Sequence, residues 1–127
     1  MPSQLRLTRI GDRIREELSM MLVKGEIRDY RLTGANITDA RVDRELAYAD
    51  IYISAVEGST RQKEILDGFE SASGFIRKML AERIELRAFP RLRFHWDPTP
   101  EKADHIEQLL LKIKKEDEAR KKQQSDH

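Results

Sequence analysis

Residues 69–80, FESASGFIRKML, place a helix break and two cations where an anion could bind. The outer apolar residues recur at three- and four-residue intervals, as on one face of a helix, but the middle reads Ser-Ala-Ser-Gly. Because an interior glycine destabilises a helix by about 0.5–1 kcal/mol relative to alanine, we predict a break near Gly74. A second helix beginning there would direct backbone N–H groups at an anion, with Arg77 and Lys78 in its first two turns. A plain junction between two helices that both pack on the core explains the same residues.

Further basic residues follow the break and predict a basic surface. Arg91 and Arg93 alternate with apolar residues, as on the outer face of a strand. Phosphates respond to such local surfaces, so a total charge of only +1 does not exclude a nucleic-acid partner. A solvated face with ordinary ion pairs is the alternative. The candidate nucleic-acid-binding residues are Ala72, Ser73 and Gly74 for close approach of the backbone, Arg77, Lys78, Arg87, Arg91 and Arg93 for phosphates, and Arg9 and Arg13 as secondary candidates.

The sequence gives little support to catalysis. None of its three histidines lies near a second ligand at a metal-binding spacing, and no Walker loop, His-Glu-x-x-His motif or nucleophile elbow occurs. Asp39, Asp43 and Asp50 could meet across a hairpin as the carboxylates of a nuclease, but a charged rim on an exposed strand accounts for them. We therefore expect a protein that is not an enzyme, with no catalytic residue, metal, cofactor or small-molecule substrate.

Length and composition predict one compact domain. The chain has 127 residues, of which 39% are hydrophobic and 37% charged, which suits a buried core under a charged surface. It has no cysteine, so disulfides are excluded and a reducing, cytoplasmic location is expected. No apolar run approaches the roughly 20 residues that cross a bilayer, and no membrane partner is expected.

The hydrophobic periodicity predicts the elements that hold these residues. A helix is expected over residues 4–24, then two antiparallel strands within residues 35–55, with a bulge between Ile37 and Ala40. The broken helix ends near residue 84, a strand covers residues 91–96, and a last helix begins at Thr99 and Pro100. This order predicts an α+β layer with helices on one face of the sheet. We expect residues 1–115 to form the domain and residues 116–127 to be a charged, disordered tail.

Four stretches in this order resemble the ribosome-binding factor A family, over residues 5–113. No single stretch is decisive, but together they are hard to obtain by accident. They read RIGDRIREEL at residues 9–18, RELAYADIYIS at residues 44–54, SASGFIR at residues 71–77 and RAFPRLRF at residues 87–94.

The resemblance implies a type-II KH-like domain, of order α-β-β-α-kinked α-β, with a three-stranded sheet and a short C-terminal helix. In this family an Ala-x-Gly junction, here Ala72-Ser73-Gly74, replaces the usual Gly-x-x-Gly loop, and KH domains hold a nucleotide backbone at that point. The implied partner is the small (30S) ribosomal subunit with its 16S rRNA, during late maturation and 5′-end processing, with a role in growth in the cold. We expect a monomer.

The chain departs from the family pattern in two loops and in the hairpin turn, where Asp43-Arg44-Glu45-Leu46 stands for the usual Ser-Arg-Asp-Leu, and it keeps one alternative open. Asp29-Tyr30-Arg31 stands where relatives often have Asp-Pro-Arg, and Ala88-Phe89 replaces the common hydroxyl residues before the proline. These differences affect the expected contacts rather than the family. The alternative is a KH-like module that binds protein without direct RNA contact, through the exposed hairpin face and the charged C-terminal helix.

Overall fold

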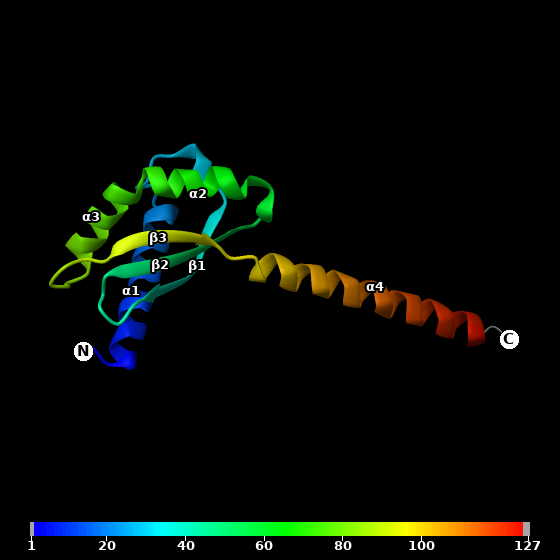
Figure 1. Ribbon diagram of the computed structural model, residues 1–127. Coiled ribbons are helices and arrows are strands. Elements are labelled where there is room, and N and C mark those ends of the chain that lie inside the picture. Colours follow the sequence, from blue (N-terminus) through cyan, green and yellow to red (C-terminus); the bar gives the residue numbers. More distant parts are fainter. Residues whose placement is uncertain (1, 126–127) are drawn as a thin grey trace. The chain divides into compact units, whose positions relative to one another are not determined.

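The computed structural model describes residues 2–125 and divides into two units, one up to Asp97 and one from Pro98 onward. The first unit contains three helices, three strands and two 3-10 turns, and the second contains one helix (Figure 1). In chain order the elements are α1 (Gln4–Val23), a 3-10 turn (Tyr30–Leu32), β1 (Ala35–Val42), β2 (Tyr48–Ala55), a second 3-10 turn (Ser59–Arg61), α2 (Gln62–Ser71), α3 (Ser73–Arg83), β3 (Arg91–Trp96) and α4 (Thr99–Ser125).

The sheet has the strand order β1-β2-β3, with β2 in the centre. β1 and β2 are antiparallel, and their register shifts between Ile37 and Asp39, which confirms the predicted bulge. β2 and β3 are parallel, from the pair Tyr48 and Arg91 to the pair Ile53 and Trp96. A parallel pair needs a long crossover connection, and α2 and α3 provide it. The expected order α-β-β-α-kinked α-β is confirmed, and the fold is KH-like.

The core lies between the helices and one face of the sheet. On β2 the residues Ala49, Ile51 and Ile53 are completely buried, while the alternate residues Tyr48 and Tyr52 lie on the opposite face. The helices contribute further completely buried apolar side chains, namely Ile14, Leu18 and Met21 from α1, Ile65 and Phe69 from α2, and Ile76 and Leu80 from α3.

Gly11 allows α1 to approach the sheet closely. A Cβ atom at this position would lie 2.3 Å from the carbonyl oxygen of Ala40 in β1, a separation that real Cβ atoms essentially never show. Gly11 is itself buried. The glycine therefore fixes the distance between helix and strand, and no other residue fits unless α1 moves.

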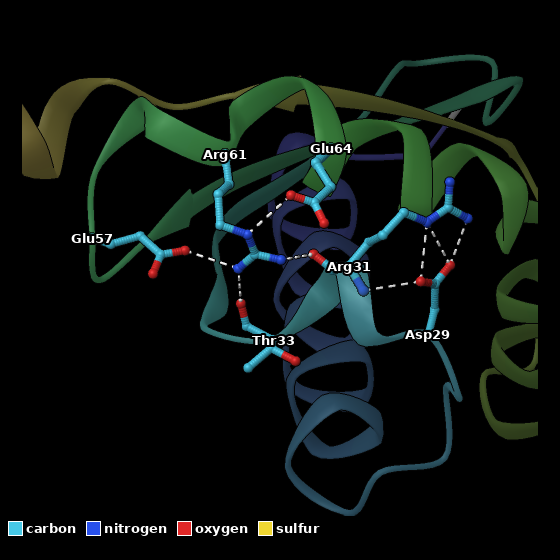
Figure 2. A network of polar contacts seen from close by, with 6 residues as sticks. All are labelled: Asp29, Arg31, Thr33, Glu57, Arg61 and Glu64. Carbon is cyan, nitrogen blue, oxygen red and sulfur yellow. Dashed lines mark hydrogen bonds and ion pairs between the residues drawn. The ribbon is translucent and has the colours of Figure 1, made fainter.

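Arg61 fastens the first 3-10 turn to the start of α2 (Figure 2). Its guanidinium donates to the backbone oxygens of Arg31 and Thr33, at 2.9 and 2.8 Å, and pairs with Glu57 and Glu64 at 2.9 and 3.1 Å. In the same turn Asp29 accepts hydrogen bonds from the side chain of Arg31, and these bonds are the main reason why the pKa of Asp29 is lowered. The loop after α1 is thus held in place next to α2.

α4 differs in length from the expected short helix. It continues to Ser125, so residues 116–125 are helical in the structure, and the compact unit ends at Asp97 rather than at residue 115. The tail was expected from its lack of apolar residues, but Lys, Glu, Gln and Arg are strong helix formers in their own right. Opposite charges also fall four residues apart, as in Lys114 and Glu118 or Glu116 and Arg120. Asp126 and His127, the end of the expected tail, lie outside the described residues.

Within residues 2–125, no helix combines the length and the apolar content that crossing a bilayer requires.

Candidate nucleic-acid-binding site

The predicted break in the helix is confirmed and is a single residue long. α2 ends at Ser71, α3 begins at Ser73, and Ala72 between them has non-helical dihedral angles of −89° and 0°. The N–H of Ala72 donates to Gly68 at 3.1 Å, and its carbonyl accepts from Ile76 at 2.9 Å, so the junction is tightly bonded. A sharp change of direction is therefore built into the backbone, with both helices still anchored by buried residues.

The main chain is open at the start of α3. Gly74 is exposed, and a Cβ atom placed on it would meet no atom within 4 Å. Neighbouring Ser73 and Ala72 are partly buried. Another molecule can consequently reach the backbone at Gly74 without displacing a side chain of this protein.

Arg77 has a different role from the one expected. Its guanidinium donates to the backbone oxygens of Phe89, at 2.7 Å, and Pro90, at 3.2 Å. Both of these residues are buried, so their carbonyl groups need a partner within the protein. Arg77 therefore holds the loop before β3 against α3, and much of its hydrogen-bonding capacity is already used.

Arg93 also lies in a paired environment. It forms a bidentate contact with Asp50, at 2.8 and 3.0 Å, and its guanidinium lies 4.1 Å from the ring centroid of Tyr48. The same carboxylate lies 2.7 Å from Nε2 of His95. Burial raises the pKa of Asp50, but hydrogen bonds from Arg93 and His95 outweigh it, and the net pKa is lowered. The charge of Arg93 is thus balanced on the open face of the sheet.

Three of the predicted cations remain available beside the loop that Arg77 holds. Lys78 follows Arg77 in α3, Arg87 lies in the loop, and Arg91 begins β3. All three are exposed, and none has an ion pair or side-chain hydrogen bond with another of residues 2–125. We call Lys78, Arg87 and Arg91 the basic cluster. Because Arg77 ties α3 to the loop, these three residues lie on connected segments.

The two secondary candidates are on α1. Arg13 pairs with Glu17 at 3.0 Å, whereas Arg9 is exposed and has no such partner in the described part of the chain. No side-chain contact there joins either residue to the basic cluster. Lys78 thus follows Arg77 on α3, and the Arg77 contact joins α3 to the loop that carries Arg87 and leads to Arg91. Arg9 and Arg13 lie on α1, and Arg93 is paired with Asp50.

The three aspartates of the nuclease alternative have separate structural partners. Asp39 pairs with Arg41, Asp50 with Arg93 and His95, and Asp43 accepts from the backbone N–H groups of the hairpin turn. Over residues 2–125, no three His, Cys, Asp or Glu side chains are grouped so that they could hold a metal ion.

Sequence reasoning missed a cavity beside the junction. It has a volume of about 500 Å³ and lies between residues 26–29, which follow α1, and Ser71, Ala72 and Phe75. No spacing or motif in the sequence links the loop after α1 to the junction. Phe75, an apolar residue next to the helix break, is exposed in the structure instead of buried with the rest of that apolar face.

Comparisons with known proteins agree on one family. A family model described as "Ribosome-binding factor A" matches residues 6–110. The chain is similar to the ribosome-binding factor A of Magnetococcus marinus, with 41% identity over 107 residues, which covers 84% of this chain and 86% of that protein. It is also similar to the one of Alcanivorax borkumensis, with 40% identity over 113 residues, covering 88% and 82%.

A solved structure supports the fold. The crystal structure of ribosome-binding factor A from Thermus thermophilus superimposes with a TM-score of 0.61 and 20% sequence identity, covering 70% of this chain and 93% of that one. At this identity the likeness concerns the arrangement of helices and strands.

Proposed function

Because the chain belongs to the ribosome-binding factor A family, we propose that it is an assembly factor that binds the small (30S) ribosomal subunit and its 16S rRNA. In this proposal it acts as a monomer in the cytoplasm, during late maturation and 5′-end processing of the rRNA, and supports growth in the cold. It works by occupying a site on immature subunits and catalyses no reaction.

The observation that carries this proposal is an open stretch of main chain next to unpaired cations. At Gly74 a phosphate group can approach the backbone without meeting a side chain, and Lys78, Arg87 and Arg91 are exposed nearby in the chain or across the Arg77 contact. Contacts to phosphates supply affinity and fix the position of a nucleic acid, while carrying little sequence information. Arg77 contributes by holding the loop that presents Arg87 and Arg91.

The salt dependence of RNA binding tests this mechanism. Each phosphate neutralised on a single strand adds about 0.7 to the slope of log affinity against log salt, so three cations predict a contribution of roughly 2. A Lys78→Ala, Arg87→Ala, Arg91→Ala variant should bind short RNAs and small subunits more weakly and with a slope smaller by about that amount. Fluorescence anisotropy over a range of KCl concentrations measures both.

A matched variant separates local from general charge effects. Lys24, Arg44 and Lys63 are likewise exposed and lack side-chain partners among residues 2–125, so changing all three to alanine removes the same charge elsewhere. Its slope should stay close to that of the unmodified protein. Nearly salt-independent binding, or equal losses in both triple variants, would show that the basic cluster is not the phosphate-binding surface.

The protein-binding alternative has one observation in its favour. On the open sheet face Arg93, Asp50 and His95 balance one another, and Tyr48 is fixed beneath Arg93, an arrangement that resembles the rigid Tyr and Arg anchors of protein interfaces. Pull-down of the tagged protein from an extract, with and without nuclease, distinguishes the two functions. A partner that survives nuclease treatment supports the alternative, and loss of all partners supports RNA binding.

A further inference from the structure

The cavity beside the junction has one apolar and aromatic wall and one polar wall. Phe75, at 46% exposure, and Ala72 line it from the helices, and Ile27 provides a buried apolar surface from the loop after α1. A volume of about 500 Å³ lies within the range of small-ligand sites. An exposed aromatic ring in an apolar lining is the kind of surface on which a planar group stacks.

The polar wall suits a neutral group that donates hydrogen bonds. Glu26 and Asp29 place carboxylates in the lining and Arg28 places an exposed guanidinium there, so the lining carries charges of both signs. Each carboxylate is already paired, Glu26 with Arg83 at 2.8 Å and Asp29 with Arg31 at 2.7 Å, so the cavity also lacks the net negative charge that would attract a Lys or Arg side chain of a partner. The wall can still accept hydrogen bonds.

Glu26 has one carboxylate oxygen that can accept a further hydrogen bond. Its Oε2 atom accepts from Arg83, while Oε1 has no hydrogen bond with any group in residues 2–125. Asp29 is more fully used, since both of its oxygens accept from Arg31. An exocyclic amino group, as on adenine or cytosine, is a donor of the type that a glutamate accepts, whereas uracil presents carbonyl oxygens at the corresponding position.

We propose that this cavity binds one unpaired nucleobase that carries an exocyclic amino group, stacked on Phe75 and hydrogen-bonded to Glu26. The inference rests on the proposed RNA binding and extends it, because the basic cluster contacts phosphates of any sequence and this cavity adds a preference among bases. Ser71, Ala72 and Phe75 of the cavity and Lys78 of the basic cluster belong to the same short segment, residues 71–78.

Binding of RNA octamers tests the proposal directly. Single-stranded oligo(A), oligo(C) and oligo(U) are titrated with the full-length protein at one salt concentration. We expect oligo(A) and oligo(C) to bind about tenfold more tightly than oligo(U), the discrimination that one good base contact gives. Phe75→Ala should weaken the binding of the amino-bearing octamers by about tenfold through the lost stacking.

Glu26→Gln provides the sharper variant because it replaces an acceptor by a donor. The Nη2 atom of Arg83 needs an acceptor at the position of Oε2, so the single oxygen of glutamine takes that place and its amide NH₂ takes the place of Oε1. The preference for oligo(A) and oligo(C) over oligo(U) should then disappear or reverse, with unchanged salt dependence. Glu82→Gln, an exposed position on α3 outside the cavity, makes the same change of charge and should keep the original preference.

Each outcome decides between the two proposals. Equal binding of the three octamers, or a Glu26→Gln variant with the original preference, overturns the nucleobase site and leaves RNA binding in place. Failure to bind any octamer or small subunit overturns the proposed function as well. If Glu26→Gln weakens association with small subunits but not the binding of octamers, the cavity takes a protein group and the nucleobase assignment is wrong.

Discussion

At the scale of single residues, the same side-chain type serves two different purposes. Sequence reasoning grouped five basic residues as phosphate ligands, yet Arg77 donates to backbone carbonyls and Arg93 pairs with Asp50. Whether an arginine binds a group of its own protein depends on the carbonyls and carboxylates that the fold brings close to it. The spacing of arginines along the chain does not predict these partners. Lys78, Arg87 and Arg91 keep the exposure expected of ligands.

Gly74 offers the most local test of the proposed function. Because a side chain there meets nothing within 4 Å, Gly74→Leu should leave the fold intact. The leucine would nevertheless cover the open backbone, and we expect RNA affinity to fall by about tenfold, comparable to the loss of one charge-assisted contact. Circular dichroism checks the fold and anisotropy measures the affinity.

Ala81→Leu is the matched control for this substitution. Position 81 is also exposed on α3 but lies outside the junction, and the added side chain is the same. It should bind RNA as the unmodified protein does. A folded Gly74→Leu protein with unchanged affinity would contradict the role of the junction.

At the scale of elements, most of the helices and strands could be predicted because hydrophobic periodicity sets them. Three- and four-residue spacing of apolar residues predicts the broken helix. Alternation of apolar and polar residues predicts the hairpin with its bulge and the strand at residues 91–96. The cavity could not be predicted in this way, since it arises where a loop after α1 packs near the end of α2. That packing depends on Arg61 and on Gly68, whose missing side chain leaves room for Leu32.

A substitution at Gly11 tests the close packing of α1 against β1. Gly11→Ala places a methyl group against the backbone oxygen of Ala40, and since neither backbone can yield without moving a whole element, we expect a loss of roughly 1–3 kcal/mol in the free energy of unfolding. Urea denaturation followed by circular dichroism gives this value. Gly74→Ala is the control, because the same methyl group there enters open space in a helix and should be neutral or stabilise by up to about 1 kcal/mol. Equal stability of the two variants would rule out the close contact of α1 with β1.

At the scale of the whole molecule, the structure divides the chain after Asp97, whereas the expected domain extends to residue 115. The last apolar residues, Ile106 to Ile113, were assigned to the domain, but they lie on α4, where they are about half exposed, and the compact unit ends at Asp97. An amphipathic stripe predicts a helix, and it does not fix where along the chain a compact unit ends. The charged end of α4 is helical for a local reason, the spacing of its opposite charges.

Global stability should depend on pH through the paired aspartates. The pKa of Asp50 is lowered in the folded state, so between the folded and unfolded values the unfolded chain binds more protons. The stabilisation is therefore fully present above the ordinary value of 3.8 and is lost as the pH falls through the folded pKa. Urea denaturation at pH 7 and pH 3 should show a smaller loss of stability in Asp50→Asn than in the unmodified protein. An identical loss in both proteins would mean that Asp50 does not contribute to this dependence.

The parallel pairing of β2 with β3 also sets an order of events on the translating ribosome. β1 and β2 are adjacent in sequence and can pair as soon as the hairpin has left the exit tunnel, but Tyr48 finds its partner only when Arg91 has been synthesised. Until then the nascent chain carries a central strand with one unsatisfied edge, although α2 and α3 are synthesised before β3. During that interval the unpaired edge of β2 can pair with another chain, although β2 is the central strand of the finished sheet.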